Sequence, residues 1–190
     1  RMAKTFPDSP LWRTLGYHQD HVPWQGCSLH DLIQPSFSFL VGAALPFSIA
    51  ARTARGQTVG RMTLHAVGRA IILILLGVFL RSVGRKQTNW TFEDTLTQIG
   101  LGYVPLFLLG LVRPKWHYVA LAVVLVGYFA AFAAYPAPTS DFNFPAVGVP
   151  ADWPYHPTGF AAHWDKNSNF AWEADQTILN WFPRPKPFTH

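Results

Sequence analysis

Titratable side chains are concentrated near the start of the chain, in and just before the stretch HVPWQGCSLHD at residues 21–31. The group consists of His18, Asp20, His21, His30 and Asp31. Histidine can act as base, acid or nucleophile near neutral pH, and a carboxylate bonded to its second ring nitrogen fixes its tautomer. A His and Asp pair here would fit acyl or proton transfer. Spacing alone does not show which of these side chains touch.

Two other interpretations of the histidines stay open. A histidine at a membrane surface can simply anchor a loop. Imidazole is also a common metal ligand, but the spacing of His18, His21 and His30 matches no zinc signature, and we predict no metal.

The elements around this cluster have the composition of a membrane protein. Charged residues make up 13% of the 190 residues, against about 25% in an average globular domain. The single cysteine, Cys27, cannot form an internal disulfide. Seven basic and no acidic residues occur between residues 32 and 92. They are scattered between apolar runs and do not form the basic block with exposed aromatics that is typical of nucleic-acid binding, so we predict no nucleic-acid partner.

We predict an all-α membrane protein with about four transmembrane helices and a long aromatic-rich extracytoplasmic loop. Each apolar segment is near the roughly 20 residues that cross a bilayer. The predicted spans are residues 33–51, 64–80, 95–112 and 117–135. The expected domains are an outer loop at 1–32, a transmembrane region at 33–135 and an outer subdomain at 136–190.

The loops predict an orientation. Basic residues between the first two spans and between the last two place both loops in the cytoplasm by the positive-inside rule. Residues 1–30 and 136–190 would then lie outside, although Arg81, Arg85 and Lys86 favour the opposite. Thr91 is expected to cap the third span.

The composition of the chain changes after residue 135. Nine aromatic residues occur between residues 151 and 190, among prolines and polar groups. We predict an ordered outer segment against the membrane face, with a short amphipathic helix around residues 169–181.

The stretches HVPWQG and DLIQPSFSFLVG together resemble the signature of the heparan-alpha-glucosaminide N-acetyltransferase family and its bacterial relatives. GRAIILILLGVFL and LTQIGLGY are similar to the family's following spans, and GFAAHWDKNSN is a looser match. The resemblance covers roughly residues 15–135.

The resemblance implies a multi-pass acyltransferase of the bacterial inner membrane, which moves an acetyl group from cytosolic acetyl-CoA to an extracytoplasmic sugar or glycan. The matching His21 would carry the acetyl group or act as general base, and Asp31 would orient it. Substrate or cofactor binding would involve Trp24, Gly26, Gln98 and Tyr103. The family has further spans before and after this region, so these 190 residues are expected to be part of a longer protein and inactive alone.

Two alternatives remain. The chain could be a non-enzymatic membrane subunit or scaffold, as a homo-oligomer or within a larger complex, with the aromatic outer loop as its docking surface. A charged residue in a span, Arg69, also permits a transporter of a small anionic solute.

Overall fold

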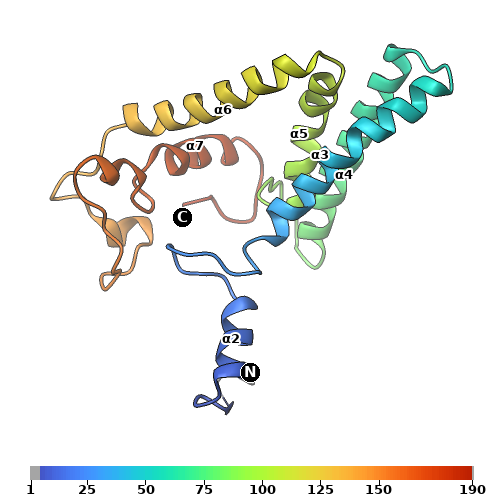
Figure 1. Cartoon of the computed structure of the whole chain (residues 1–190). Coiled ribbons are helices and arrows are strands. Elements are labelled where there is room, and N and C mark those ends of the chain that lie inside the picture. Colours follow the sequence, from blue (N-terminus) through green and yellow to red (C-terminus); the bar gives the residue numbers. More distant parts are fainter. Residues whose placement is uncertain (1–4, 190) are drawn as a thin grey trace. The chain divides into compact units, whose positions relative to one another are not determined.

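The computed structural model describes residues 5–189, and the regular elements in that range are helices (Figure 1). The α-helices are α2 (Pro10–His18), α3 (Ile33–Ala54), α4 (Val59–Ser82), α5 (Thr95–Gly110), α6 (Pro114–Ala134) and α7 (Phe170–Leu179). Two 3₁₀-helices follow α6, namely η1 (Phe144–Val147) and η2 (Gly159–Trp164). Residues 5–189 contain no β-strand, so the all-α prediction is confirmed for that range.

The chain divides into two compact units. The first covers residues 1–62, with α2, the histidine-rich loop and α3. The second covers residues 63–190, with most of α4 and all later elements. Each unit is described by itself.

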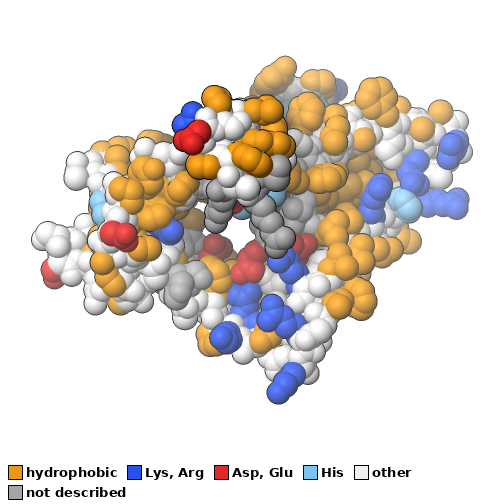
Figure 2. All heavy atoms as spheres, turned by 90° about the horizontal axis from the view of Figure 1, so that it is seen from below, with side chains coloured by type: hydrophobic (Ala, Val, Ile, Leu, Met, Phe, Trp, Pro, Cys, Tyr) orange, Lys and Arg blue, Asp and Glu red, His pale blue; other side chains and the backbone are white. Residues whose placement is uncertain are grey.

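Three helices are long and apolar enough to cross a membrane: α3 with 22 residues, α4 with 24 and α6 with 21. Most of their large apolar side chains are exposed, and hydrophobic side chains cover much of the face in Figure 2. Such surfaces are stable when hydrocarbon replaces water around them. The protein is therefore compatible with insertion in a membrane.

The predicted spans match helices, with two differences. The third, α5, has 16 residues, which is about 24 Å of helix and shorter than a bilayer core. The second is longer than predicted, because α4 begins at Val59. Arg69 consequently lies in the third turn of α4 and not close to its start.

A backbone motif ends α3. Gly56 adopts a left-handed conformation with φ 71°, and its N–H donates to the carbonyl of Thr53 at 2.9 Å. The next N–H, from Gln57, donates to the carbonyl of Arg52 at 3.1 Å. This is the Schellman arrangement, in which a residue with positive φ lets the chain fold back on the helix end.

Helices α4 and α5 approach closely because small residues face each other. A Cβ atom on Gly100 would lie 2.8 Å from the backbone oxygen of Ala70. A Cβ on Gly77 would lie 2.5 Å from the Cγ2 of Thr97, which is fully buried. Small residues at helix contacts are typical of membrane proteins, where close packing replaces the hydrophobic effect between helices.

The cap of α5 differs from the prediction. Asp94, not Thr91, is the N-cap residue, and its Oδ1 accepts from the N–H groups of Leu96 at 2.9 Å and Thr97 at 3.1 Å. Thr91 is buried and its hydroxyl donates to Glu93. The prediction placed the cap three residues too early, because an aspartate with extended backbone serves the same purpose as a threonine.

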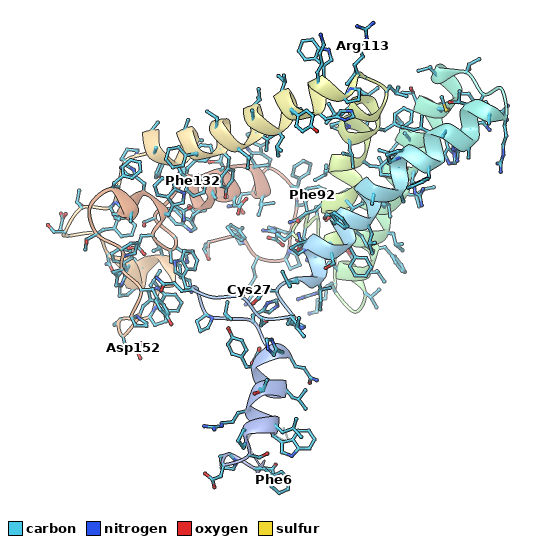
Figure 3. All side chains as sticks on the ribbon, in the orientation of Figure 1. Phe6, Cys27, Phe92, Arg113, Phe132 and Asp152 are labelled. Carbon is cyan, nitrogen blue, oxygen red and sulfur yellow. The ribbon has the colours of Figure 1, made fainter. Side chains whose placement is uncertain are left out.

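Aromatic side chains join the end of α6 to the segments that follow it. Phe132 is buried on the side of α6 that faces α7 (Figure 3). Its ring stacks on that of Trp164 in η2 and meets that of Phe170 in α7, with centroids 5.9 and 6.0 Å away. The predicted helix near the C-terminus is confirmed as α7, which Asn169 caps by accepting from the N–H of Trp172 at 3.1 Å.

We predict that Gly100→Ala destabilises the protein by about 1–3 kcal/mol, since the new methyl group meets a backbone oxygen that cannot rotate away. Gly102→Ala is the matched control, because a Cβ there meets nothing within 4 Å and only improves helix propensity. Thermal unfolding in lipid nanodiscs measures both. Equal midpoints for the two variants would contradict the close packing of α4 and α5.

Candidate functional site

The loop between α2 and α3 holds the histidine cluster in a defined conformation. The hydroxyl of Ser28 donates to the carbonyl of Asp20 at 2.7 Å, which brings the two ends of the loop together. Tyr17 at the end of α2 donates its hydroxyl to the carbonyl of Cys27 at 3.3 Å. Gly26 turns the chain with φ 109°, a conformation that side-chain-bearing residues rarely adopt.

Ser28 and Asp31 satisfy each other's backbone at the entrance to α3. The N–H of Ser28 donates to Oδ2 of Asp31 at 2.8 Å, and the N–H of Asp31 donates to Oγ of Ser28 at 3.3 Å. This reciprocal pair is a capping box with aspartate in the place of glutamate, and it starts the turn that leads into the helix. Asp31 is therefore held by the backbone before any function is considered.

The remaining carboxylate oxygen of Asp31 orients His21. The distance between Nδ1 of His21 and Oδ1 of Asp31 is 2.7 Å. The hydrogen bonds from His21 and from the N–H of Ser28 hold the pKa of Asp31 well below its usual value, so the carboxylate is ionised at neutral pH and can only accept. Nδ1 of His21 consequently donates its proton to this carboxylate, and in the neutral form of the ring Nε2 is the unprotonated nitrogen.

His21 is also the most accessible partner of this pair. Its side chain is 70% exposed, against 24% for Asp31. The ring of His30 meets the ring of His21 edge to face with centroids 4.4 Å apart. An exposed imidazole with a fixed tautomer and a free ring nitrogen can take up a proton or attack a carbonyl carbon.

The other histidine of the cluster supports the loop. Nδ1 of His18 accepts from the N–H of Leu29 at 3.4 Å. Within residues 5–189, no group of three or more His, Cys, Asp or Glu side chains is arranged to hold a metal ion.

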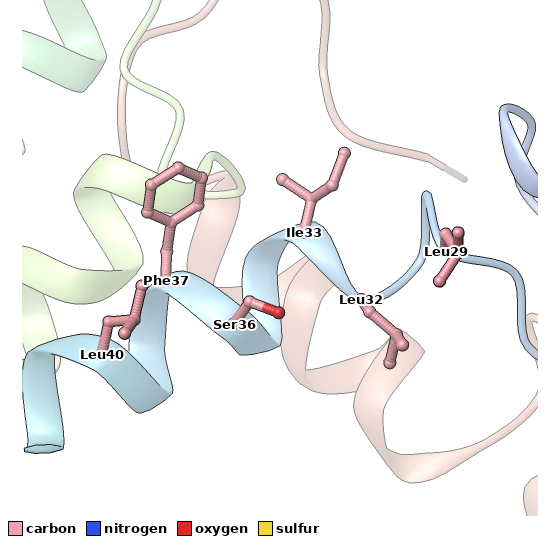
Figure 4. Close-up of a pocket in the computed structure, with 6 residues that line it drawn as sticks. All are labelled: Leu29, Leu32, Ile33, Ser36, Phe37 and Leu40. Carbon is pink, nitrogen blue, oxygen red and sulfur yellow. The ribbon is translucent and has the colours of Figure 1, made fainter.

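An apolar pocket adjoins the pair along the chain. It is lined at the start of α3 by Leu29, Leu32, Ile33, Ser36, Phe37 and Leu40 (Figure 4). Ile33 and Phe37, one helical turn apart, point to the same side (Figure 4). The pocket can receive a small apolar group or a lipid chain, but it offers few polar contacts.

The other predicted binding residues divide between the two units. Trp24 and Gly26 belong to the loop, and Trp24 is 41% exposed. Gln98 and Tyr103 lie on α5 in the second unit, where Gln98 donates to the carbonyl of Glu93 at 3.3 Å. Tyr103 is buried against α4, whereas Gln98 is exposed. The structure thus pairs His21 with Asp31 and has Trp24 and Gly26 in the same loop, and it does not bring Gln98 and Tyr103 onto one face of α5.

A second His and Asp pair was missed from the sequence. Nδ1 of His156 lies 3.0 Å from Oδ2 of Asp165, whose side chain is only 2% exposed. The carbonyl of Asp165 accepts from the side-chain amide of Asn169 at 2.8 Å, next to the start of α7. These contacts connect the irregular segment before η2 to the cap of α7, so the pair has a structural role. Two residues nine positions apart in an irregular segment gave no signal of this pairing.

The chain was compared with known proteins in three ways. A scan against protein-family models and searches of curated proteins and of solved structures found no match to this chain.

We predict that the loop loses stability in acid. Because the pKa of Asp31 is lowered in the folded chain, its contribution is complete above the usual carboxyl pKa of about 3.9 and is lost as the pH falls below that value. Hydrogen exchange of the Ser28 amide should therefore show strong protection at neutral pH and weak protection in acid, relative to the amides of α7.

The variant Asp31→Asn tests whether Asp31 causes this loss of protection in acid. This variant should expose the Ser28 amide at neutral pH and remove most of the acid-dependent change, since an amide cannot act as the charged acceptor. Wild-type protection in Asp31→Asn would contradict the assigned hydrogen bonds.

Proposed function

We propose that the protein is a transmembrane acyltransferase, which passes an acetyl group from cytosolic acetyl-CoA to an extracytoplasmic sugar or glycan acceptor. The observation that carries this proposal is the contact of 2.7 Å between Nδ1 of His21 and Oδ1 of Asp31. The resemblance of the surrounding stretch to the heparan-alpha-glucosaminide N-acetyltransferase family supports it, since the matching histidine and aspartate are the two that pair.

The chemistry follows from the free Nε2 of His21. As a general base, Nε2 takes the proton from the acceptor amine or hydroxyl while that group attacks the thioester carbonyl. The carbon–sulfur bond then breaks, and the sulfur of CoA leaves with the proton returned by the imidazolium. Alternatively, Nε2 attacks the thioester carbonyl, the carbon–sulfur bond breaks and CoA leaves as the thiolate. The acceptor then attacks the acetyl group, the bond from that group to Nε2 breaks, the acceptor's proton is released to water, and the thiolate takes a proton from water. In both routes the carboxylate of Asp31 stabilises the positive charge that develops on the ring.

We place this site on the outer face of a bacterial inner membrane. In this arrangement α5 is a fourth, short span, and residues 1–30 and 136–190 lie outside. Arg52 in the last turn of α3 and Arg55 directly after the helix favour the cytoplasmic side for the loop between α3 and α4. Trp24 and Gly26, in the same loop as His21, would shape the acceptor side.

The direct test is acetyl transfer from acetyl-CoA to an amino-sugar acceptor by the protein in proteoliposomes. We expect transfer by the wild-type protein, and a loss of at least about 100-fold in His21→Ala, because a positioned acid–base group contributes 10²–10⁴-fold. His30→Gln is the matched control. The ring of His30 meets that of His21 edge to face, and the described contacts include no hydrogen bond between His30 and Asp31.

Retained turnover in His21→Ala would remove the histidine from the mechanism. If the protein does not bind acetyl-CoA and co-purifies with a larger membrane complex, the function is that of a non-enzymatic subunit.

A further inference from the structure

A basic patch lies on α4, within the second unit. His65 and Arg69 are one helical turn apart at four-residue spacing, so their side chains lie on the same face, about 6 Å apart along the axis. Both side chains are exposed. Tyr103 on α5 borders the patch and is buried at only 7% exposure.

The Arg69 guanidinium is held in place but keeps most of its donors. Its Nη1 lies 3.5 Å from the hydroxyl oxygen of Tyr103, and its Cζ lies 5.5 Å from the centre of the tyrosine ring. A guanidinium has five N–H donors, so one phenol oxygen leaves several of them for another acceptor. Tyr103 accepts from Arg69 and therefore keeps its own O–H proton to donate.

No described carboxylate neutralises this charge. The ion pairs within residues 5–189 involve His21, His156 and Arg184. The sequence contains no acidic residue from 32 to 92, which includes all of α4. Arg69 lies roughly 15 Å along this apolar, membrane-length helix, where an unpaired cation is costly and normally has an anionic partner.

We propose that His65, Arg69 and Tyr103 form a binding site for a phosphate group, carried either by a dissolved phosphate ester or by a lipid headgroup. The planar guanidinium matches two phosphate oxygens, and one ring N–H of His65 and the O–H of Tyr103 supply further donors. Phosphate fits better than a carboxylate, because it offers enough oxygens for all three side chains. This site does not depend on acyl transfer, so it is testable whether or not the proposed function holds.

The experiment uses the chain in nanodiscs and has two arms. In the first, inorganic pyrophosphate is added to nanodiscs of neutral phosphatidylcholine at constant ionic strength, and binding is measured by calorimetry. In the second, part of the phosphatidylcholine is replaced by phosphatidylglycerol without added anion, and the thermal midpoint is measured. Arg69→Gln and Arg69→Lys test the site, and Arg81→Gln on the same helix is the matched control.

We expect pyrophosphate binding or stabilisation by phosphatidylglycerol, and the positive arm identifies the source of the phosphate. Arg69→Gln should weaken the response by about tenfold or more, as expected for loss of charged hydrogen bonds, while Arg81→Gln leaves it unchanged. Arg69→Lys should retain part of the response, which separates loss of the site from loss of the fold. The proposal is overturned if neither arm responds, or if Arg69→Gln and Arg81→Gln reduce the response equally.

Discussion

The structure depends on removing the sides of its long helices from water. α6 illustrates this constraint, since Phe132 is its only buried residue and most of its large apolar side chains are exposed. The protein itself buries little of the apolar surface of such a helix, and surrounding hydrocarbon would remove that surface from water. Within the second unit, specific contacts between elements include the close approach of α4 and α5 at Gly77 and Gly100, and the aromatic contacts at the end of α6.

Asp31 links this membrane architecture to the candidate site. One carboxylate oxygen takes part in the capping box with Ser28, and the other accepts from His21. Asp31 thus stabilises the turn that precedes α3 and also fixes the tautomer of the His21 ring. Because the capping contacts involve backbone groups, the position of the carboxylate is set by the fold of the loop, and the histidine adapts to it. A histidine placed in this way lies where a helix of membrane length starts.

The sequence predicted helices well where apolar runs are long, since the predicted spans 33–51 and 117–135 correspond to α3 and α6. It placed the start of α4 at residue 64 instead of Val59, because hydropathy marks the apolar part of a helix, whereas the first turn of α4 contains the charged Arg61. The sequence singled out His21 and Asp31 as candidates, but their contact depends on the turn at Gly26, which spacing does not reveal. The Ser-x-x-Asp pattern at residues 28–31 did carry a readable capping signal. The pair of His156 and Asp165 carried none, because the two residues lie on different irregular segments.

The central claim is that Asp31 fixes His21 with the proton on Nδ1 and the lone pair on Nε2. Nitrogen-15 NMR of the His21 ring in lipid nanodiscs at neutral pH tests this claim most directly, with assignment by comparison with His21→Gln. The account predicts that the neutral ring is predominantly protonated at Nδ1 and that Asp31→Asn shifts the population toward the Nε2-protonated form. A ring that is mainly protonated at Nε2, or a population that Asp31→Asn leaves unchanged, would contradict it.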